Sequence, residues 1–250
     1  MAAPPGQEIQ AMFGEIAPRY DFLNRLLSFG IDRAWRRRTI ASLDLPEGSE
    51  VLDLCCGTGD LALAFAQSGA SVCGADFTLP MLQAAVVKGR KAKGASKNNP
   101  GTSRNQPEIS LRWLQADAQA LPFADGSFDA VTIAFGIRNV EDPQLGLSEC
   151  QRVLRPSGRL AILEFFPIPN PIWRGLFRFY FLHVLPLIAK VVRAGRTGAY
   201  RYLPESVDNF ATPKEFQQWM EGTGLHFEQD LPLTGGVARL FIARKEPKAS

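Results

Sequence analysis

The chain has 250 residues, enough for one large domain with a substantial buried core. Hydrophobic residues make up 46% and charged residues 21%, which is typical of a globular protein, and the net charge of +3 is too mild to indicate a nucleic-acid or membrane surface. None of the four cysteines stands in a Cys-x-x-Cys pair, so spacing predicts no zinc site. The two histidines make a two-histidine metal site hard to build.

The first part of the chain, residues 7–44, is predicted to be helical. Its apolar stripe includes Phe22, Leu23, Leu26 and Leu27 at helical spacing. The arginines at 33 and 36–38 predict a charged helix face, with contact to an acidic surface as the alternative. The first ten residues lack the basic and apolar regions of a signal peptide. We therefore expect a cytoplasmic protein with free buried thiols.

Strands and helices are then expected to alternate. Strand-like runs occupy 50–55, 71–75, 110–115, 128–134 and 159–165, and helix-like runs occupy 60–67, 80–92 and 143–154. Asp142 and Pro143 suit the start of the last helix, and Pro156-Ser157-Gly158 suits its end. A helix near 213–221 and strands at 225–231 and 236–244 close the chain. This alternation predicts an α/β fold with a parallel sheet covered by helices on both faces.

Two segments interrupt the pattern. Residues 93–109 are polar with Gly and Pro, which indicates a surface loop; their basic residues lack the interleaved aromatics of a nucleic-acid site. Residues 171–193 are apolar and aromatic, but charges and a proline interrupt them. We expect a broken pair of amphipathic helices there, which serve as core, as a lid over an apolar pocket or as a face that touches a membrane. His183 in this segment is a packing residue or a substrate contact.

The stretch VLDLCCGTGDL, at 51–61, is a glycine-rich turn between a strand and a helix. Gly57, Gly59 and Ala62 match the dinucleotide-binding template, and Asp76 follows at about the expected distance. However, Asp53 and Asp60 would place two carboxylates beside a pyrophosphate and repel it.

S-adenosylmethionine, which is cationic and carries no phosphate, removes that objection. Asp53 would favour its cationic end, and the glycines would allow close backbone approach. Asp76 would accept both ribose hydroxyls, Asp117 would accept from the adenine amino group, and the Ala118 N–H would reach a ring nitrogen. Thr58, Phe77 and Phe135 complete the predicted cofactor set. Because these residues follow the carboxyl ends of successive strands, they are expected to meet at one edge of the sheet.

Several longer segments resemble known enzymes. VLDLCCGTGDL, GADFTLPML, ADAQALPFADGSFDAV and RVLRPSGRLAILEF resemble motifs of class I S-adenosylmethionine-dependent methyltransferases. MFGEIAPRYDFLNRLLSFGIDRAWRR, FGIRNVEDPQLGLSECQRVLRPSG, FLHVLP and AYRYLPESVDNF resemble the quinone-biosynthesis C-methyltransferases of the UbiE/MenG family, over about residues 9–244. The paired cysteines are most similar to the cyanobacterial and plastid branch, which methylates demethylphylloquinone.

The resemblance implies a Rossmann-like fold with a mainly parallel seven-stranded sheet. Residues 1–45 would form a helical cover and 46–250 the methyltransferase domain, with a lid at 168–205. The implied reaction is C-methylation of a reduced prenylated quinone, demethylphylloquinol or demethylmenaquinol, whose ring becomes nucleophilic on losing a hydroxyl proton.

The catalytic expectation falls on three residues. Arg138 would polarise the quinol oxygen, with an ion pair to Glu141 or Glu164 as the alternative, while Asn139 and Tyr20 would contact that oxygen. The aromatic stretch at 173–181 would hold the lipid tail, or simply form core. Peripheral membrane contact and a homodimer fit this family, and no nucleic-acid partner is expected. An NAD-dependent oxidoreductase, and a methyltransferase acting on RNA or another small molecule, remain alternatives; the RNA reading is weakened by the lack of an aromatic–basic surface.

Overall fold

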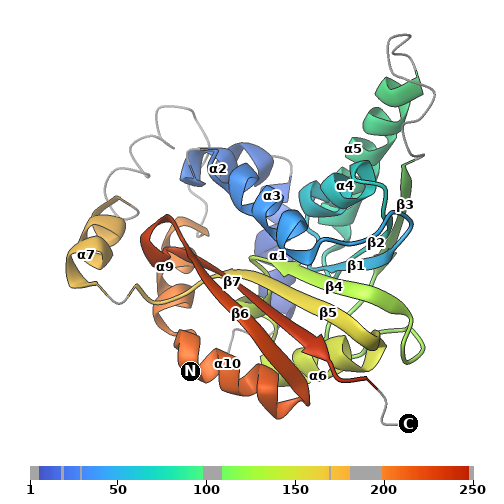
Figure 1. Ribbon diagram of the computed structural model, residues 1–250. Coiled ribbons are helices and arrows are strands. Elements are labelled where there is room, and N and C mark those ends of the chain that lie inside the picture. The colour runs from blue at the N-terminus through green and yellow to red at the C-terminus, as the bar shows by residue number, and fades with distance from the viewer. Residues whose placement is uncertain are drawn as a thin grey trace.

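The computed structural model describes residues 6–17, 20–28, 30–97, 109–168, 170–180 and 199–247. Within these ranges seven strands form one sheet in the order β3-β2-β1-β4-β5-β7-β6 (Figure 1). The strands are β1 Glu50–Leu54, β2 Ser71–Asp76, β3 Ser110–Gln115, β4 Phe128–Ala134, β5 Leu154–Phe165, β6 Leu225–Leu233 and β7 Ala238–Lys245. Pairing among β1 to β5 is parallel, whereas β7 runs antiparallel to both β5 and β6. The predicted, mainly parallel seven-stranded sheet is confirmed.

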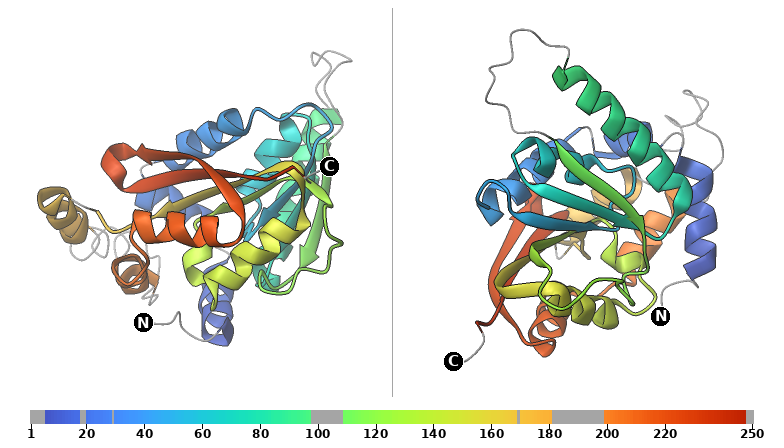
Figure 2. Two further views of the ribbon diagram at one scale, coloured as in Figure 1. Left: turned by 60° about the horizontal axis from the view of Figure 1, so that its bottom comes forward. Right: turned by 90° about the vertical axis from the view of Figure 1, so that its right-hand side faces the viewer.

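Helices cover both faces of this sheet. In Figure 1, α3, α4 and α5 lie above it, and α6 and α10 lie below; the turned views of Figure 2 show the same two layers. The helices are α1 Gly6–Ile16, α2 Tyr20–Ser28, α3 Asp32–Leu43, α4 Asp60–Gln67, α5 Leu79–Lys97, α6 Pro143–Val153, α7 Pro171–Phe179, α9 Ala199–Asp208 and α10 Pro213–Gly222. Helices α2, α7 and α9 lie beyond the carboxyl ends of the parallel strands (Figure 1).

Local sequence explains where several helices begin. The Asp142 carboxylate accepts from the backbone N–H groups of Gln144 and Leu145, and Pro143 takes the first helical position of α6, as predicted. Thr212 and Glu215 form a reciprocal capping box at the start of α10. Each cap satisfies backbone donors that the first helical turn leaves without partners.

The core has one cluster on each face of the sheet. Below the sheet, the rings of Phe166, Phe216 and Phe241 lie with centroids 5.0–5.3 Å apart and are fully buried. Above it, Leu43 and Phe65 pack on the opposite face of the same strands. Each such side chain stabilises the fold by about 1.5–3 kcal/mol through burial, so the sheet is a firm base for its loops.

The structure differs from the predicted elements in three places. The N-terminal helical segment divides into α1, α2 and α3. Helix α5 continues to Lys97, because residues 93–97 are helical and not part of the expected polar loop. Strand β5 begins at Leu154, five residues early: Ser157 has a φ of 66°, and the β4–β5 register shifts there, so the expected helix stop is a bulge inside the strand.

The remaining part of the loop expected at 93–109, residues 98–108, lies outside the described residues. So do His183 and the middle of the lid expected at 168–205, residues 181–198. Within the described ranges no helix is long and apolar enough to cross a membrane. Contact of α7 with a membrane surface and formation of a homodimer stay predictions.

Candidate functional site

A cavity of about 130 Å³ opens at the carboxyl ends of β1, β2 and β4. In the sheet, β1 has β2 on one side and β4 on the other, so the strand order reverses at β1. Ligands of open α/β sheets bind outside the carboxyl ends of the strands at such a point. Helices α1 and α2 supply another wall. Residues lining the cavity are Gly6, Ile9, Phe13, Tyr20, Leu54, Cys55, Gly57, Asp76, Phe77, Thr78, Met81, Ala116, Asp117, Ala118, Gln119, Ala134, Phe135, Gly136, Asn139, Val140 and Glu141.

The turns that follow β1 and β4 approach each other very closely. A Cβ added to Gly136 would lie 2.3 Å from the Cβ of Cys55, so only glycine fits there. Cys55 and Phe135 themselves have φ values of 53° and 60°, in the left-handed region that side chains rarely adopt. Such backbone strain persists only where the surroundings enforce it, and it is common at ligand sites.

Asp76, at the end of β2, links the glycine-rich turn to the start of α5. One carboxylate oxygen accepts from the Gly57 N–H and the other from the Thr78 N–H, both at 2.8 Å. Burial raises the pKa of Asp76, although these two N–H groups favour its charged form. The carboxylate is therefore held in one orientation at the cavity wall, with lone pairs left for ribose hydroxyls.

Asp117 and Ala118 lie on the loop that follows β3. The Asp117 carboxylate accepts from the Gln119 N–H at 2.9 Å, and Asp117 also forms an isolated bridge with Ala120. Both predicted adenine contacts line the large cavity together with Asp76 and Phe77. The structure thus brings Asp76, Phe77, Asp117 and Ala118 together at one edge of the sheet, and their contacts with a cofactor stay a prediction.

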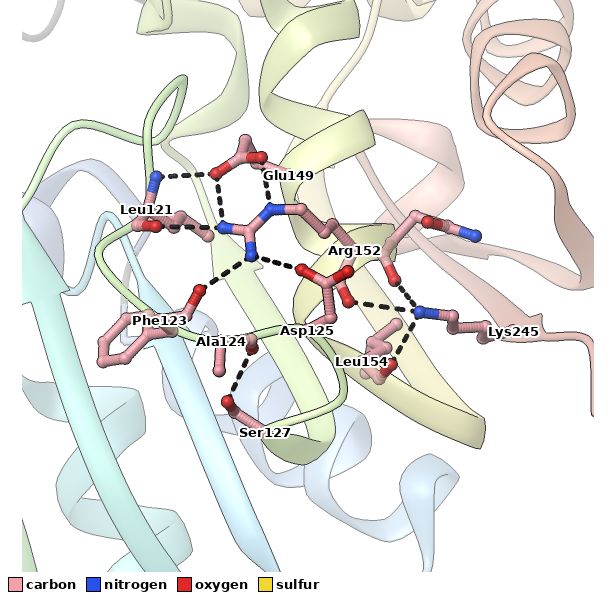
Figure 3. A network of polar contacts seen from close by, with 10 residues as sticks. Leu121, Phe123, Ala124, Asp125, Ser127, Glu149, Arg152, Leu154 and Lys245 are labelled. Atoms are coloured by element: carbon pink, nitrogen blue, oxygen red, sulfur yellow. Dashed lines mark hydrogen bonds and ion pairs between the residues drawn. The ribbon is translucent and has the colours of Figure 1, made fainter. Parts of the chain in front are cut away.

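Arg152 of α6 anchors the far end of this loop (Figure 3). Its guanidinium donates to the backbone oxygens of Leu121 at 2.9 Å and Phe123 at 2.7 Å, and it pairs with Glu149 and Asp125. Glu149 in turn accepts from the Leu121 N–H at 2.7 Å. A loop without regular structure is thus fixed to a helix at several points, which positions its Asp117 end.

Asp53 lies in a smaller cavity of about 20 Å³ beside the large one, with Thr58. Its side chain is 1% exposed; one oxygen accepts from the Thr132 hydroxyl at 2.8 Å, and the other has no hydrogen-bond partner among the described residues. Burial raises the pKa of Asp53 to about 7, against the opposing effects of the Thr132 hydroxyl and the Ala62 N–H. An unpaired buried carboxylate oxygen fits a cationic ligand, as S-adenosylmethionine is.

Arg138 forms an ion pair with Glu164, which the sequence analysis gave as one alternative to a contact with the substrate. Its guanidinium pairs with Glu164 at 2.6 Å and donates to the Phe135 oxygen at 2.9 Å and the Ser206 hydroxyl at 3.3 Å. It does not line the large cavity. Asn139 does, and its side-chain oxygen accepts from the Tyr202 hydroxyl of α9 at 2.8 Å.

Tyr20 lines both cavities, and burial raises its pKa. Gly59 lines neither: a Cβ there would lie 2.3 Å from the Trp113 ring, so this glycine serves close packing. Sequence reasoning missed Arg36, Thr132 and Tyr202 as site neighbours. The WR pair in the first helical segment and the YRYLPES stretch were the available signals for two of them.

Comparison with known proteins gives the family. The model of the ubiE/COQ5 methyltransferase family matches residues 2–245. A demethylmenaquinone methyltransferase of Thermus thermophilus is 47% identical over 92% of this chain and 98% of its own length. A ubiquinone/menaquinone biosynthesis C-methyltransferase UbiE of Geotalea uraniireducens is 44% identical over 96% of this chain and 97% of its own length.

Solved structures agree on the fold. The [4+2]-cyclase SpnF superimposes with a TM-score of 0.68 at 16% identity, covering 99% of this chain and 98% of its own. A S-adenosylmethionine-dependent methyltransferase from Aquifex aeolicus gives 0.58 at 18% identity, covering 84% of this chain and 88% of its own. The glycine-rich turn is compatible with NAD and with S-adenosylmethionine, and the family match decides for S-adenosylmethionine. The chain belongs to the ubiE/COQ5 methyltransferase family and is a S-adenosylmethionine-dependent C-methyltransferase.

Proposed function

We propose that the enzyme methylates a ring carbon of a reduced 2-prenyl-1,4-naphthoquinone, with demethylmenaquinol or its phytyl analogue, demethylphylloquinol, as substrate. The observation that carries the proposal is the 47% identity, over 98% of that protein, to a demethylmenaquinone methyltransferase. A benzoquinol is the alternative, because the Geotalea relative is named for both ubiquinone and menaquinone biosynthesis.

The cavity wall next to the predicted cofactor residues suits a flat aromatic ring. Phe135 and Gly136 line it with the neutral polar side chains of Asn139 and Tyr20. Because burial raises the pKa of Tyr20, its phenol stays protonated at neutral pH and would donate to a ring oxygen. Asn139 is held by Tyr202 and would contact that oxygen from the other side.

S-adenosylmethionine, when bound, supplies an electrophilic methyl group. The protein's residues would orient the ring against that methyl and favour the anionic form of the ring oxygen. Arg138 would act on the reaction indirectly, because its hydrogen bond to the Phe135 carbonyl fixes the turn that carries Asn139. We propose it as a positioning residue, in place of direct contact with the substrate.

The lipid tail would leave the cavity toward the lid expected at 168–205. On α7 the side chains of Leu176 and Phe179 are exposed, at 55% and 59%. This offers apolar area to a long prenyl or phytyl chain, as we predicted for the 173–181 stretch. The helical cover at 1–45 would close the opposite side, since Ile9 and Phe13 line the cavity.

The test is methyl transfer from labelled S-adenosylmethionine to a panel of acceptors. The panel holds demethylmenaquinol, demethylphylloquinol, a demethylated benzoquinol and the oxidised form of each. We expect product only from reduced acceptors, because the ring must be electron-rich, and faster turnover with naphthoquinols. Turnover confined to the benzoquinol would overturn the ring assignment, and turnover of none would overturn the quinol assignment. The two naphthoquinols compared at equal concentration decide between the tails.

A further inference from the structure

The side-chain amide of Asn139 has one defined orientation. Asn139 ends the short 3-10 turn Ile137–Asn139 that follows β4, and it lines the large cavity. Its nitrogen Nδ2 donates to the Phe135 carbonyl at 3.4 Å, and its oxygen Oδ1 accepts from the Tyr202 hydroxyl at 2.8 Å. A carbonyl can only accept, so turning the amide over would place two oxygens against each other at Phe135. The nitrogen therefore faces Phe135 and the oxygen faces Tyr202.

Tyr202 is suited to hold the amide in this way. Burial raises the pKa of Tyr202, so its phenol keeps the proton that it donates at neutral pH. The two charges that act on it, Arg138 and Glu164, pair with each other at 2.6 Å and therefore largely cancel. The hydrogen bond to Asn139 thus has a steady donor.

The same face of α9 holds the Ile137–Asn139 turn at a second point. Tyr202 and Ser206 are four residues apart on this helix, so their side chains lie on one face. The Nε of Arg138 donates to the Ser206 hydroxyl at 3.3 Å. Among the described residues, the wall of the large cavity includes Asn139 but neither Tyr202 nor Ser206. Any effect of these two α9 side chains on a bound ring must therefore pass through the turn.

The amide keeps one donor for a ligand. An amide nitrogen carries two hydrogens, and the Phe135 carbonyl takes one of them. The bond from Tyr202 to the amide oxygen strengthens the remaining N–H as a donor, because linked hydrogen bonds polarise one another. Such a donor binds an anionic oxygen about twice as strongly as a neutral one. It therefore favours a ring oxygen that has lost its proton over a ring hydroxyl.

We propose that Tyr202 is a positioning residue, which holds the Asn139 amide so that its remaining N–H donates to the ring oxygen that becomes anionic. Tyr202 acts through Asn139 and does not touch the substrate. The inference rests on the proposed function only in taking a ring oxygen as the group that faces Asn139. Because α9 carries Tyr202, the turn presents this donor only when α9 is docked on it.

The first experiment measures the ionisation of 1-naphthol, an analogue of the naphthoquinol ring, bound to the full chain together with S-adenosylhomocysteine. Absorbance follows formation of the naphtholate as the pH rises. On the wild type, naphthol should ionise about one pH unit lower than on Tyr202→Phe, which corresponds to about 10-fold stronger stabilisation of the anion. The other titratable groups of the cavity wall act equally in both proteins; they are Tyr20, Cys55, Asp76, Asp117 and Glu141.

A double-mutant cycle separates an effect through Asn139 from a general loosening of α9. With the acceptor that the wild type methylates, Tyr202→Phe should lower kcat about 10-fold and leave the affinity for S-adenosylhomocysteine unchanged. In an Asn139→Ala background the same substitution should cost nothing further, because the amide is gone. Ser206→Ala is the matched control: it removes the other contact of α9 with the turn and should leave naphthol ionisation as in the wild type.

Either of two results overturns the inference. The same naphthol ionisation on the wild type and Tyr202→Phe, or no naphthol bound by either, would show that Tyr202 orients no donor toward a ring oxygen. Equal losses of kcat from Tyr202→Phe with and without the Asn139 amide would assign Tyr202 to holding α9 in place. The naphthol measurement needs no methyl transfer, so a wild type that methylates no quinol but lowers the pH of naphthol ionisation relative to Tyr202→Phe overturns the proposed function and supports this inference.

Discussion

At the scale of single residues, ionisation of Asp53 has opposite effects on cofactor binding and on the stability of the ligand-free protein. Its folded-state pKa of about 7 lies above the ordinary value of about 3.9, so the ligand-free protein gains stability from it below about pH 4 and loses that gain as pH rises through 7. At about 1.4 kcal/mol per pH unit, the loss is on the order of 4 kcal/mol. Cofactor binding has the opposite dependence, because the ionised carboxylate attracts a cation.

We expect Asp53→Asn to stabilise the ligand-free protein at pH 8 and to leave its stability near pH 4 almost unchanged. Urea unfolding of both proteins between these pH values measures the difference. Affinity for S-adenosylmethionine should rise through pH 7 in the wild type and be lower and nearly flat in the variant. A stability difference that does not change with pH would contradict the buried, unpaired carboxylate.

Arg138 and Glu164 form a buried pair whose members cannot be removed singly without cost. Burial raises the pKa of Glu164, and Arg138 opposes that effect. Arg138→Met should destabilise the fold by about 3–5 kcal/mol, because it leaves a buried carboxylate unpaired. Adding Glu164→Gln should restore part of the stability.

The two variants also separate structure from catalysis. Turnover should fall strongly in Arg138→Met and stay low in the stabilised double variant, because the Phe135 carbonyl loses its short bond from Arg138 and keeps only the longer one from the Asn139 side chain, at 3.4 Å. Thermal unfolding and the methyl-transfer assay give the two readouts, and binding of S-adenosylhomocysteine should be retained. Full activity in the double variant would remove the positioning role.

At the scale of elements, helix α6 holds in place the loop that follows β3 and carries Asp117. Arg152→Met should lower the melting temperature and weaken cofactor affinity several-fold, because the Asp117 loop loses its backbone anchors to Leu121 and Phe123. Arg155→Met is the matched control, since the Arg155 side chain pairs with Asp129 and does not hold the backbone of Leu121 or Phe123. Calorimetry and thermal unfolding of both variants check this. Equal effects would show that the loop does not depend on α6.

The sequence predicted most helices and strands, and the proximity of Asp76 and Asp117, for a physical reason. Asp76 and Asp117 follow parallel strands whose carboxyl ends meet at one edge, so alternation alone brings them together. The partner of Asp53 could not be predicted this way, and for Arg138 the sequence left Glu141 and Glu164 both open. Thr132 reaches Asp53 across 79 residues and Glu164 reaches Arg138 across 26, and both contacts depend on strand register and side-chain orientation. The bulge at Ser157 was missed because Pro-Ser-Gly is equally typical of a helix end.

At the scale of the whole molecule, the proposed N-terminal cover is attached to the domain through polar contacts. Asp21 of α2 pairs with Lys88 of α5 at 2.6 Å and accepts from the Thr58 hydroxyl in the glycine-rich turn. Lys88 also contacts Thr58 and Asp60. Cover, turn and α5 therefore meet at one group of charges, beside the cavity that Tyr20 of the cover lines.

Such an attachment makes the speed of cofactor exchange sensitive to ionic strength. Asp21 and Lys88 are 30% and 24% exposed, so dissolved ions reach them, and the Debye length falls from about 10 Å at 0.1 M salt to about 3 Å at 1 M. S-adenosylhomocysteine is neutral overall, so salt should act mainly on the cover. In stopped-flow displacement, S-adenosylhomocysteine should dissociate from the wild type faster as the salt concentration rises. From Lys88→Met it should dissociate fast at all salt concentrations. The salt content of its surroundings would then set how quickly the enzyme discards its spent cofactor.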